Sequence, residues 1–105
     1  ETLGPESLAQ KIRHVIQACE GSIPNLEDIA VQFHATSRTI RRKLKAEGYT
    51  YQGILSEELC RKAINYLETT KLTVEQITHL LGYGESASFI HAFKRWTGKA
   101  PRDYR

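Results

Sequence analysis

The sequence repeats one pattern, and this repeat limits the chain to a duplicated helical architecture. Residues 26–29, Leu-Glu-Asp-Ile, correspond to residues 74–77, Val-Glu-Gln-Ile. Phe33 corresponds to Leu81. With one extra residue in the second turn, Ile40 corresponds to Phe89 and Leu44 to Phe93, and Gly48 and Gly98 close the two copies. Each copy has the apolar spacing of a short helix, a tight turn and a second helix. The sequence therefore predicts two helix-turn-helix units.

Apolar residues outside the repeat also recur at helical spacing. The first set is Leu8, Ile12, Val15 and Ile16, and the set within residues 51–69 is Leu55, Leu59, Ala63 and Leu67. No segment alternates with a period of two, so no sheet is expected. The sequence predicts an all-α fold of about seven helices. Its expected divisions are a linker end at 1–5, a first subdomain at 6–49, a linker helix at 50–70 and a second subdomain at 71–105.

Capping residues mark where the helices of the repeat begin. Asn25 with Asp28, and Thr73 with Gln76, have the three-residue spacing of a capping box. Thr36 or Ser37 is a suitable cap for the helix that follows the first turn, and glycines close both units. Ala100-Pro101 predicts a last short helical turn.

The composition is that of an ordinary globular domain, with 40% hydrophobic and 26% charged residues. No apolar run approaches the ~20 residues of a membrane span, and the polar, acidic residues 1–7 do not predict a signal peptide. The start at Glu1 and the absence of methionine suggest a fragment of a longer protein. The expected location is the cytoplasm. The net charge of the chain is +3. Residues 37–48 carry +4 and residues 85–105 carry +3, while the rest of the chain is net negative. Two separated basic blocks indicate contact with a polyanion at two places, although a single block also fits an ordinary solvated face.

The helix predicted at about 37–47 has the composition of a helix that reads the major groove of DNA. Only Ile40 and Leu44 are clearly apolar, so one narrow side docks and the rest faces solvent. Arginine can donate two parallel hydrogen bonds to guanine, while hydroxyl and ammonium groups bind phosphates. The predicted base contacts are Arg38, Arg41 and Arg42, and the predicted phosphate contacts are Ser37, Thr39, Lys43 and Lys45. The alternative is a charged surface helix without a ligand.

The helix predicted at about 85–97 is the second candidate reader. Its core side carries Phe89, Ala92, Phe93 and Trp96, and small residues in its first turn allow close approach to base edges. The predicted base contacts are Ser86, Ala87 and His91, and the predicted phosphate contacts are Ser88, Lys94 and Arg95. An ordinary surface histidine is an equal alternative for His91. Ile90 packs either on sugar and methyl groups of DNA or against a neighbouring helix.

Enzyme chemistry has little support in the sequence. The four histidines form no recognised metal-ligand spacing with Cys, Asp, Glu or one another, and no phosphate-binding or nucleophile motif is present. No catalytic residue, metal or cofactor is therefore expected.

Cys19 and Cys60 form no CxxC pair, so a disulfide is not expected. Cys60 is interpreted as a small core residue, with redox sensing as the alternative.

Residues 63–105 strongly resemble the C-terminal signature of the AraC/XylS family of bacterial transcription regulators. The residues that carry the resemblance are Leu81-Gly82-Tyr83, Phe89, Phe93-Lys94-Arg95, Gly98, Pro101 and Tyr104-Arg105. Residues 26–48 are similar to the less regular first helix-turn-helix of the same domain. The resemblance extends over about residues 8–105.

The resemblance implies sequence-specific binding of a promoter-proximal DNA duplex, with the two second helices in successive major grooves. It also implies an N-terminal effector-binding or dimerisation domain and contact with RNA polymerase. Two positions depart from the family pattern. Many relatives carry Arg at the position of His91, and Gly84 replaces a polar side chain, which weakens the cap of the following helix. From the residues alone, a helical protein-interaction domain with acidic partners and a small enzyme stay open as alternatives.

Overall fold

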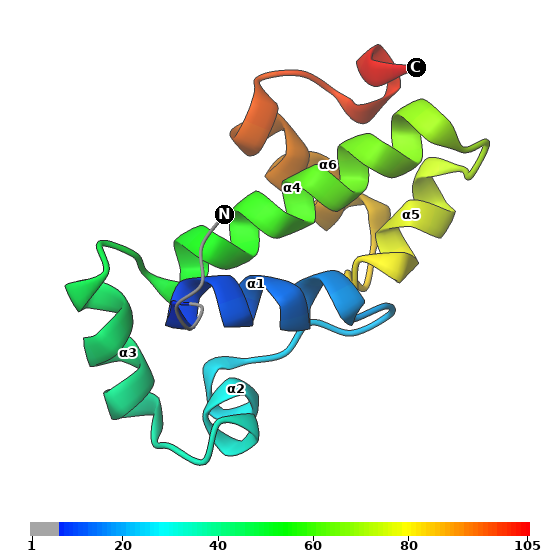
Figure 1. Cartoon of the computed structure of the whole chain (residues 1–105). Coiled ribbons are helices and arrows are strands. Elements are labelled where there is room, and N and C mark those ends of the chain that lie inside the picture. Colours follow the sequence, from blue (N-terminus) through cyan, green and yellow to red (C-terminus); the bar gives the residue numbers. More distant parts are fainter. Residues whose placement is uncertain (1–6) are drawn as a thin grey trace.

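The computed structural model describes residues 7–105 and is helical throughout that range (Figure 1). The elements are α1 (Leu8–Ala18), α2 (Leu26–Gln32), α3 (Ser37–Ala46), α4 (Tyr51–Thr69), α5 (Val74–Leu80), α6 (Ser86–Thr97) and the 3-10 helix η1 (Pro101–Tyr104). Figure 1 shows α3 at one end of the molecule and α5 at the other, with α4 running between them. Within residues 7–105, no helix combines the length and the apolar character needed to cross a bilayer.

The predicted all-α architecture with two helix-turn-helix units and a long linker helix is confirmed. The linker helix spans Tyr51–Thr69, and the second helices of the two units begin within a residue of their predicted starts. The predicted linker end at residues 1–5 lies outside the described residues. The subdomain boundaries at 6–49, 50–70 and 71–105 stay a prediction.

The predicted caps form as the sequence indicates. The Asn25 side chain accepts from the Asp28 backbone N–H while the Asp28 carboxylate accepts from the Asn25 backbone N–H, which completes a capping box at α2. Thr73 and Gln76 form the same reciprocal pair at α5. At α3 the cap is Thr36, whose hydroxyl accepts from the Thr39 N–H. These bonds satisfy N–H groups that a helix start otherwise leaves without partners.

One continuous core joins the two units across α4. Its buried members in the first unit are Ile29, Ala30, Ile40 and Leu44; in α4 they are Ile54, Leu55, Leu59, Ala63 and Leu67; in the second unit they are Ile77, Leu81, Phe89 and Phe93. Helix α1 adds Ala9, Ile12 and Ile16 to the same core. Because the buried residues of α4 belong to the same cluster as those of both units, the linker helix is part of the core rather than a solvated spacer.

Both ends of α1 are held by side chains from other elements. The carboxylate of Glu47, at the end of α3, accepts from the backbone N–H groups of Leu8 and Ala9, each at 3.1 Å. At the other end, the Lys62 ammonium of α4 donates to the carbonyls of Ile16 and Cys19. A negative group at the start of a helix and a positive group at its end both match the direction of the helix dipole.

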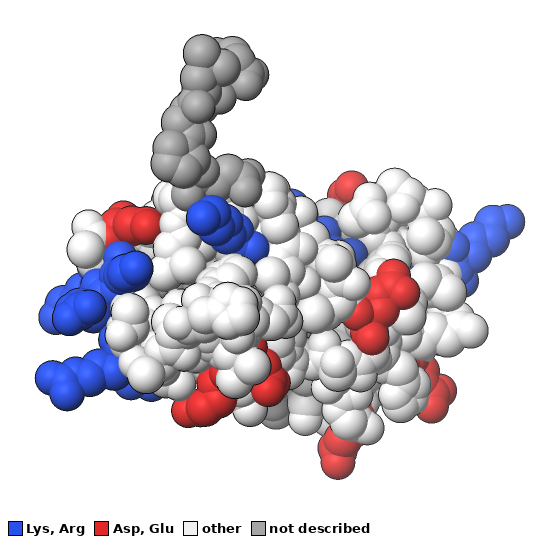
Figure 2. Space-filling model, turned by 60° about the horizontal axis from the view of Figure 1, so that its bottom comes forward, with Lys and Arg blue, Asp and Glu red and all other residues white. Residues whose placement is uncertain are grey.

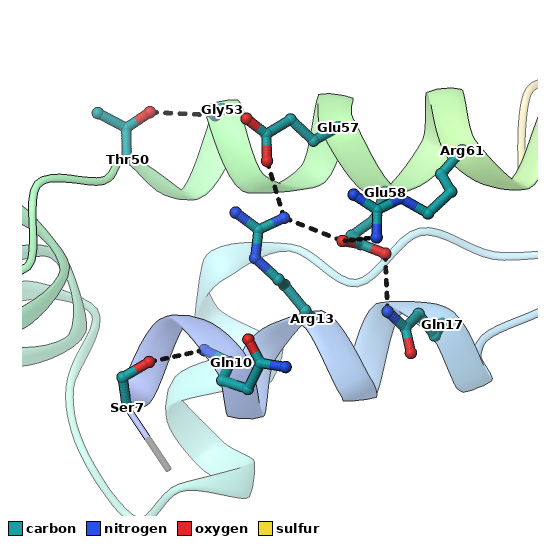
Figure 3. A network of polar contacts seen from close by, with 9 residues as sticks. All are labelled: Ser7, Gln10, Arg13, Gln17, Thr50, Gly53, Glu57, Glu58 and Arg61. Carbon is teal, nitrogen blue, oxygen red and sulfur yellow. Dashed lines mark hydrogen bonds and ion pairs between the residues drawn. The ribbon is translucent and has the colours of Figure 1, made fainter. Parts of the chain in front are cut away.

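Midway along α1, a polar network connects it to α4 (Figure 3). Arg13 Nη1 lies 2.9 Å from Glu58 Oε2 and 2.8 Å from Glu57 Oε1. Gln17 Nε2 donates to Glu58 Oε1 at 3.0 Å, and Arg61 lies 4.0 Å from the same carboxylate. The hydrogen bond to Glu58 raises the pKa of the Arg13 guanidinium further above its ordinary value. These contacts anchor α1 to the linker helix at a fixed register.

Candidate nucleic-acid interface

The turns of the two units have the same backbone geometry, which places α3 and α6 in equivalent positions. In the first turn Phe33 N–H donates to the Ile29 carbonyl and Ala35 N–H donates to the Ala30 carbonyl. In the second turn the equivalent pairs are Leu81 with Ile77 and Tyr83 with Thr78. The central turn residue is left-handed in both, with φ of 54° at His34 and 88° at Gly82.

Helix α3 presents nearly all of its length to solvent. Ile40 and Leu44 are buried and dock the helix, as predicted. The exposed basic side chains are Arg38, Arg41, Arg42, Lys43 and Lys45, while Ser37 and Thr39 are half-buried. Figure 2 shows Lys and Arg side chains gathered at the end of the molecule where α3 lies. Within residues 7–105, no ion pair joins these α3 side chains to a carboxylate, so their charge stays available to a polyanion.

Helix α6 is held by aromatic packing. Phe89 and Phe93 are fully buried, and the Phe93 ring meets Tyr104 edge-on with centroids 5.1 Å apart. Tyr83 packs on Phe89 from the turn, with centroids 6.0 Å apart. The opposite side is open to solvent. Its exposed members are Ala87, Ser88, His91, Lys94 and Arg95, while Ser86 is half-buried at the helix start.

The start of α6 differs from the starts of the other helices of the repeat. Glu85 occupies the N-cap position without a side-chain hydrogen bond to the helix, in agreement with the weak cap expected from Gly84. The first-turn N–H groups therefore lack the side-chain partner that Asn25 or Thr73 supplies elsewhere. Ile90 is half-buried and lines a hollow with Val74 and Pro101, which agrees with packing against neighbouring elements.

Three polar residues beside these helices were not singled out from the sequence. Thr50 and Gln52, at the start of α4, line one hollow together with Arg41. Arg102 of η1 lines another with Lys94. Thr50 and Gln52 lie near α3 because α4 begins five residues after α3 ends, and Arg102 lies near α6 because η1 packs on that helix. The sequence signal that could have found these residues is a polar residue within one position of a predicted helix start, at Tyr51 or at Pro101.

The remaining reactive groups are dispersed. Among residues 7–105, no cluster of three or more His, Cys, Asp or Glu side chains is placed to hold a metal ion. Cys19 and Cys60 are both free and half-buried, and burial raises the pKa of the Cys60 thiol. Cys60 is thus less buried than the core position expected from the sequence, and it lines a hollow on α4 with Arg61 and Trp96.

Comparison with known proteins agrees with this geometry. A family model described as a helix-turn-helix domain matches residues 29–105. The ornithine utilization regulator of Pseudomonas aeruginosa is 42% identical over 95% of this chain and 30% of its own length. The solved transcriptional regulator CdpR of Pseudomonas aeruginosa is 34% identical and has a TM-score of 0.84, over 92% of this chain and 31% of that one. The DNA-binding domain of AdpA, solved with a target DNA, shares the fold at 20% identity, with a TM-score of 0.80 over 95% of this chain and 90% of that one.

The chain belongs to the AraC/XylS family of transcription regulators, and it is the DNA-binding helix-turn-helix domain of that family. The resemblance stated from the sequence is therefore confirmed. The chain spans 30% of the length of the ornithine utilization regulator, so the activity of a whole protein of that kind extends beyond what these residues show.

Proposed function

We propose that α3 and α6 read base edges in two successive major grooves on one face of a promoter-proximal duplex. The observation that carries the proposal is the exposed positive charge on α3. Five basic side chains are exposed on a helix docked only by Ile40 and Leu44, and none of the five is paired with a carboxylate within residues 7–105. A helix of this kind fits the major groove and neutralises phosphates at its rims.

The roles divide by the reach and chemistry of each side chain. Arg38, Arg41 and Arg42 bind base edges from α3, while Ser37, Thr39, Lys43 and Lys45 bind phosphates. From α6, Ser86, Ala87 and His91 contact bases, while Ser88, Lys94 and Arg95 bind phosphates. The arginines of α3 favour guanine because they can donate two parallel hydrogen bonds to it, whereas Ala87 favours the methyl group of thymine. The two half-sites are therefore expected to differ in base composition.

The length of the linker helix supports this spacing. The 19 residues of α4 extend about 28 Å at about 1.5 Å per residue, against a groove repeat of about 34 Å. The AdpA domain, which shares the fold, was solved with a target DNA. The span of α4 favours simultaneous engagement of both units over binding by one unit alone.

The wider regulator has further parts under this proposal. The greater length of the ornithine utilization regulator supports an additional N-terminal effector-binding or dimerisation domain. Contact with RNA polymerase links DNA binding to transcription, and the site of action is the bacterial cytoplasm, where the DNA lies. The domain itself binds DNA without a catalytic role or a cofactor.

Selection from a randomised duplex library at two salt concentrations tests the proposal. The expected result is a motif of two blocks centred about 10 base pairs apart, with affinity that falls steeply with salt. A motif of one block would assign base reading to one unit only. Weak, salt-sensitive binding without a motif would contradict sequence-specific reading by this domain.

Paired variants separate base reading from general charge. The double variant Arg41→Ala/Arg42→Ala is expected to lower affinity for the selected site by tenfold to about a hundredfold per lost guanine contact. Lys71→Ala removes an exposed charge outside α3 and α6 and is expected to leave affinity nearly unchanged. If the arginine variant keeps its fold and its DNA affinity, α3 is not a reader, and an acidic protein partner becomes the better explanation of its charge.

A further inference from the structure

The loop that precedes the first helix-turn-helix unit contacts the second unit directly. The loop that follows α1 reaches the end of α5, where Gly21 N–H donates to the Leu80 carbonyl at 2.8 Å. Figure 1 shows this loop beside the end of α5. Since the last carbonyls of a helix lack partners within it, this bond gives the Leu80 carbonyl of α5 a partner from the loop that follows α1.

The same loop packs on the turn of the second unit at Gly82. A Cβ placed on Gly82 would lie 2.8 Å from Ile23 Cγ1 and 3.1 Å from both Ile23 N and the Ser22 carbonyl carbon. A Cβ atom essentially never lies as close as 2.8 Å to another heavy atom, and the two neighbours at 3.1 Å, which is tighter than most Cβ contacts, are backbone atoms. The contact therefore requires the absence of a side chain at this position.

The first unit shows that the turn itself does not require glycine. His34 occupies the equivalent position with the same hydrogen bonds around it and with φ of 54°. His34 is exposed, so its side chain has room. What distinguishes Gly82 from His34 is the loop at residues 22–23 that lies against it.

Mostly apolar side chains surround the contact. Residues from α1, the loop, α4 and α5 enclose one small cavity there: Ile16, Ile23, Leu55, Leu59, Leu80 and Leu81 are among its lining side chains. Helix α6 begins at Ser86, four residues after Gly82. A change in how the loop meets the turn therefore acts directly on the start of the second reading helix.

We propose that the contact of Gly82 with residues 22–23 is a positioning joint that fixes the orientation of α6 relative to α3, and so sets the half-site spacing that the domain accepts. The inference rests on the proposed function. Packing on α4 holds the second unit along one helix, and the contact at Gly82 adds a second attachment away from that helix axis, which restrains rotation of the unit about α4. Gly82 is then a determinant of spacing that touches no DNA.

The orientation can be measured without DNA. Residual dipolar couplings of backbone N–H groups in the 105-residue chain report whether α2 and α3 share one alignment tensor with α5 and α6. The wild type is expected to fit one tensor, and Gly82→Ala is expected to need two. Gly98→Ala is the matched control, because Gly98 has nearly the same backbone angle, φ of 82°, and no atom lies within 4 Å of the point that its Cβ would occupy. This control is expected to keep one tensor.

The spacing preference is measured on duplexes whose half-sites are moved by one base pair, a displacement of about 3.4 Å and about 35° around the axis. The wild type is expected to lose about tenfold or more in affinity on each change, and Gly82→Ala to lose about threefold or less. If Gly82→Ala fails to fold, Ile23→Ala removes the nearest atom from the other side and is expected to shift both readouts in the same direction. One tensor and an unchanged spacing profile in the folded variant would overturn the joint. Failure of the wild type to select any two-block site would instead overturn the proposed function, and the couplings would still decide on the joint.

Discussion

Arg13 of α1 and Glu58 of α4 form an ion pair of 2.9 Å in which the Glu58 side chain is fully buried and that of Arg13 is 14% exposed. A buried carboxylate is costly to desolvate unless hydrogen bonds and charge compensate it. Here Gln17 binds the second oxygen at 3.0 Å. The Glu58 carboxylate of the linker helix can therefore stay buried only while α1 holds Arg13 and Gln17 beside it.

Removal of Arg13 should destabilise the domain strongly. Arg13→Ala leaves the Glu58 carboxylate buried with a weaker set of partners, and the expected loss in free energy of unfolding is about 3 kcal/mol. Urea unfolding followed by fluorescence of the single tryptophan measures this loss. Arg61→Ala is the control, since Arg61 is 69% exposed and 4.0 Å from the same carboxylate, and it should cost less than about 1 kcal/mol. Equal losses in the two variants would contradict the assigned role of Arg13.

Glu47 should stabilise α1 although it belongs to the end of α3. Glu47→Ala removes the acceptor for the Leu8 and Ala9 N–H groups, and the expected loss is about 1 kcal/mol, as for other helix caps. Hydrogen exchange should accelerate at the first turn of α1 before it changes in α3. Glu47→Gln keeps one acceptor oxygen and should retain part of the protection. Unchanged exchange in the alanine variant would show that the carboxylate does not cap α1.

Arg105 should hold the end of the linker helix. Its guanidinium donates to the carbonyls of Leu67 at 3.1 Å and Thr70 at 3.0 Å, which α4 itself leaves without partners. Arg105→Ala is expected to lower the free energy of unfolding by about 1 kcal/mol and to increase amide exchange over the last turn of α4. Arg102→Ala, an exposed arginine of η1, serves as the stability control. The same loss in both variants would argue against a specific cap.

Tyr51 should make the domain less stable in alkali. Burial, with smaller contributions from Cys19 and Asp28, raises the pKa of Tyr51 from 10.0 to about 12. Between these values the unfolded chain has released the proton while the folded chain still holds it, so stability falls as pH rises above 10. Tyr51→Phe should flatten this decline, and it should cost about 1 kcal/mol at neutral pH by removing the 2.5 Å hydrogen bond to the Pro24 carbonyl. A decline of equal slope in the variant would assign the alkaline sensitivity to other tyrosines.

Local sequence signals predict much of this fold because they depend on neighbouring residues. The cap pairs Asn25 with Asp28 and Thr73 with Gln76 lie three residues apart, and they form as predicted. The bounds of α4 follow from an apolar period that continues for 19 residues. The exposed side of α3 follows from its two apolar residues. The roles assigned to single side chains on α3 and α6 stay predictions, because exposure alone does not distinguish a base contact from a phosphate contact.

Features that depend on distant residues could not be predicted in the same way. Glu58 belongs by residue type to a solvated face, and only Arg13 and Gln17, more than 40 positions earlier, make its burial acceptable. Lys62 and Arg105 act on helix ends far from them in the sequence. Gly82 could be recognised as a turn glycine, but the crowding by Ile23 becomes visible only once the two units are placed side by side.

The dependence of α4 on α1 extends the folding unit beyond the residues that the family model matches. The family match begins at residue 29 and omits α1, yet α1 contributes three buried side chains and the only arginine within hydrogen-bond distance of Glu58 among the described residues. A chain that lacked α1 would expose the apolar strip of α4 that α1 covers and would remove Arg13 and Gln17 from Glu58. Exchange of DNA-reading modules between regulators should therefore succeed when the crossover lies before Ser7, and should yield insoluble or partly folded chimaeras when it lies between α1 and α2.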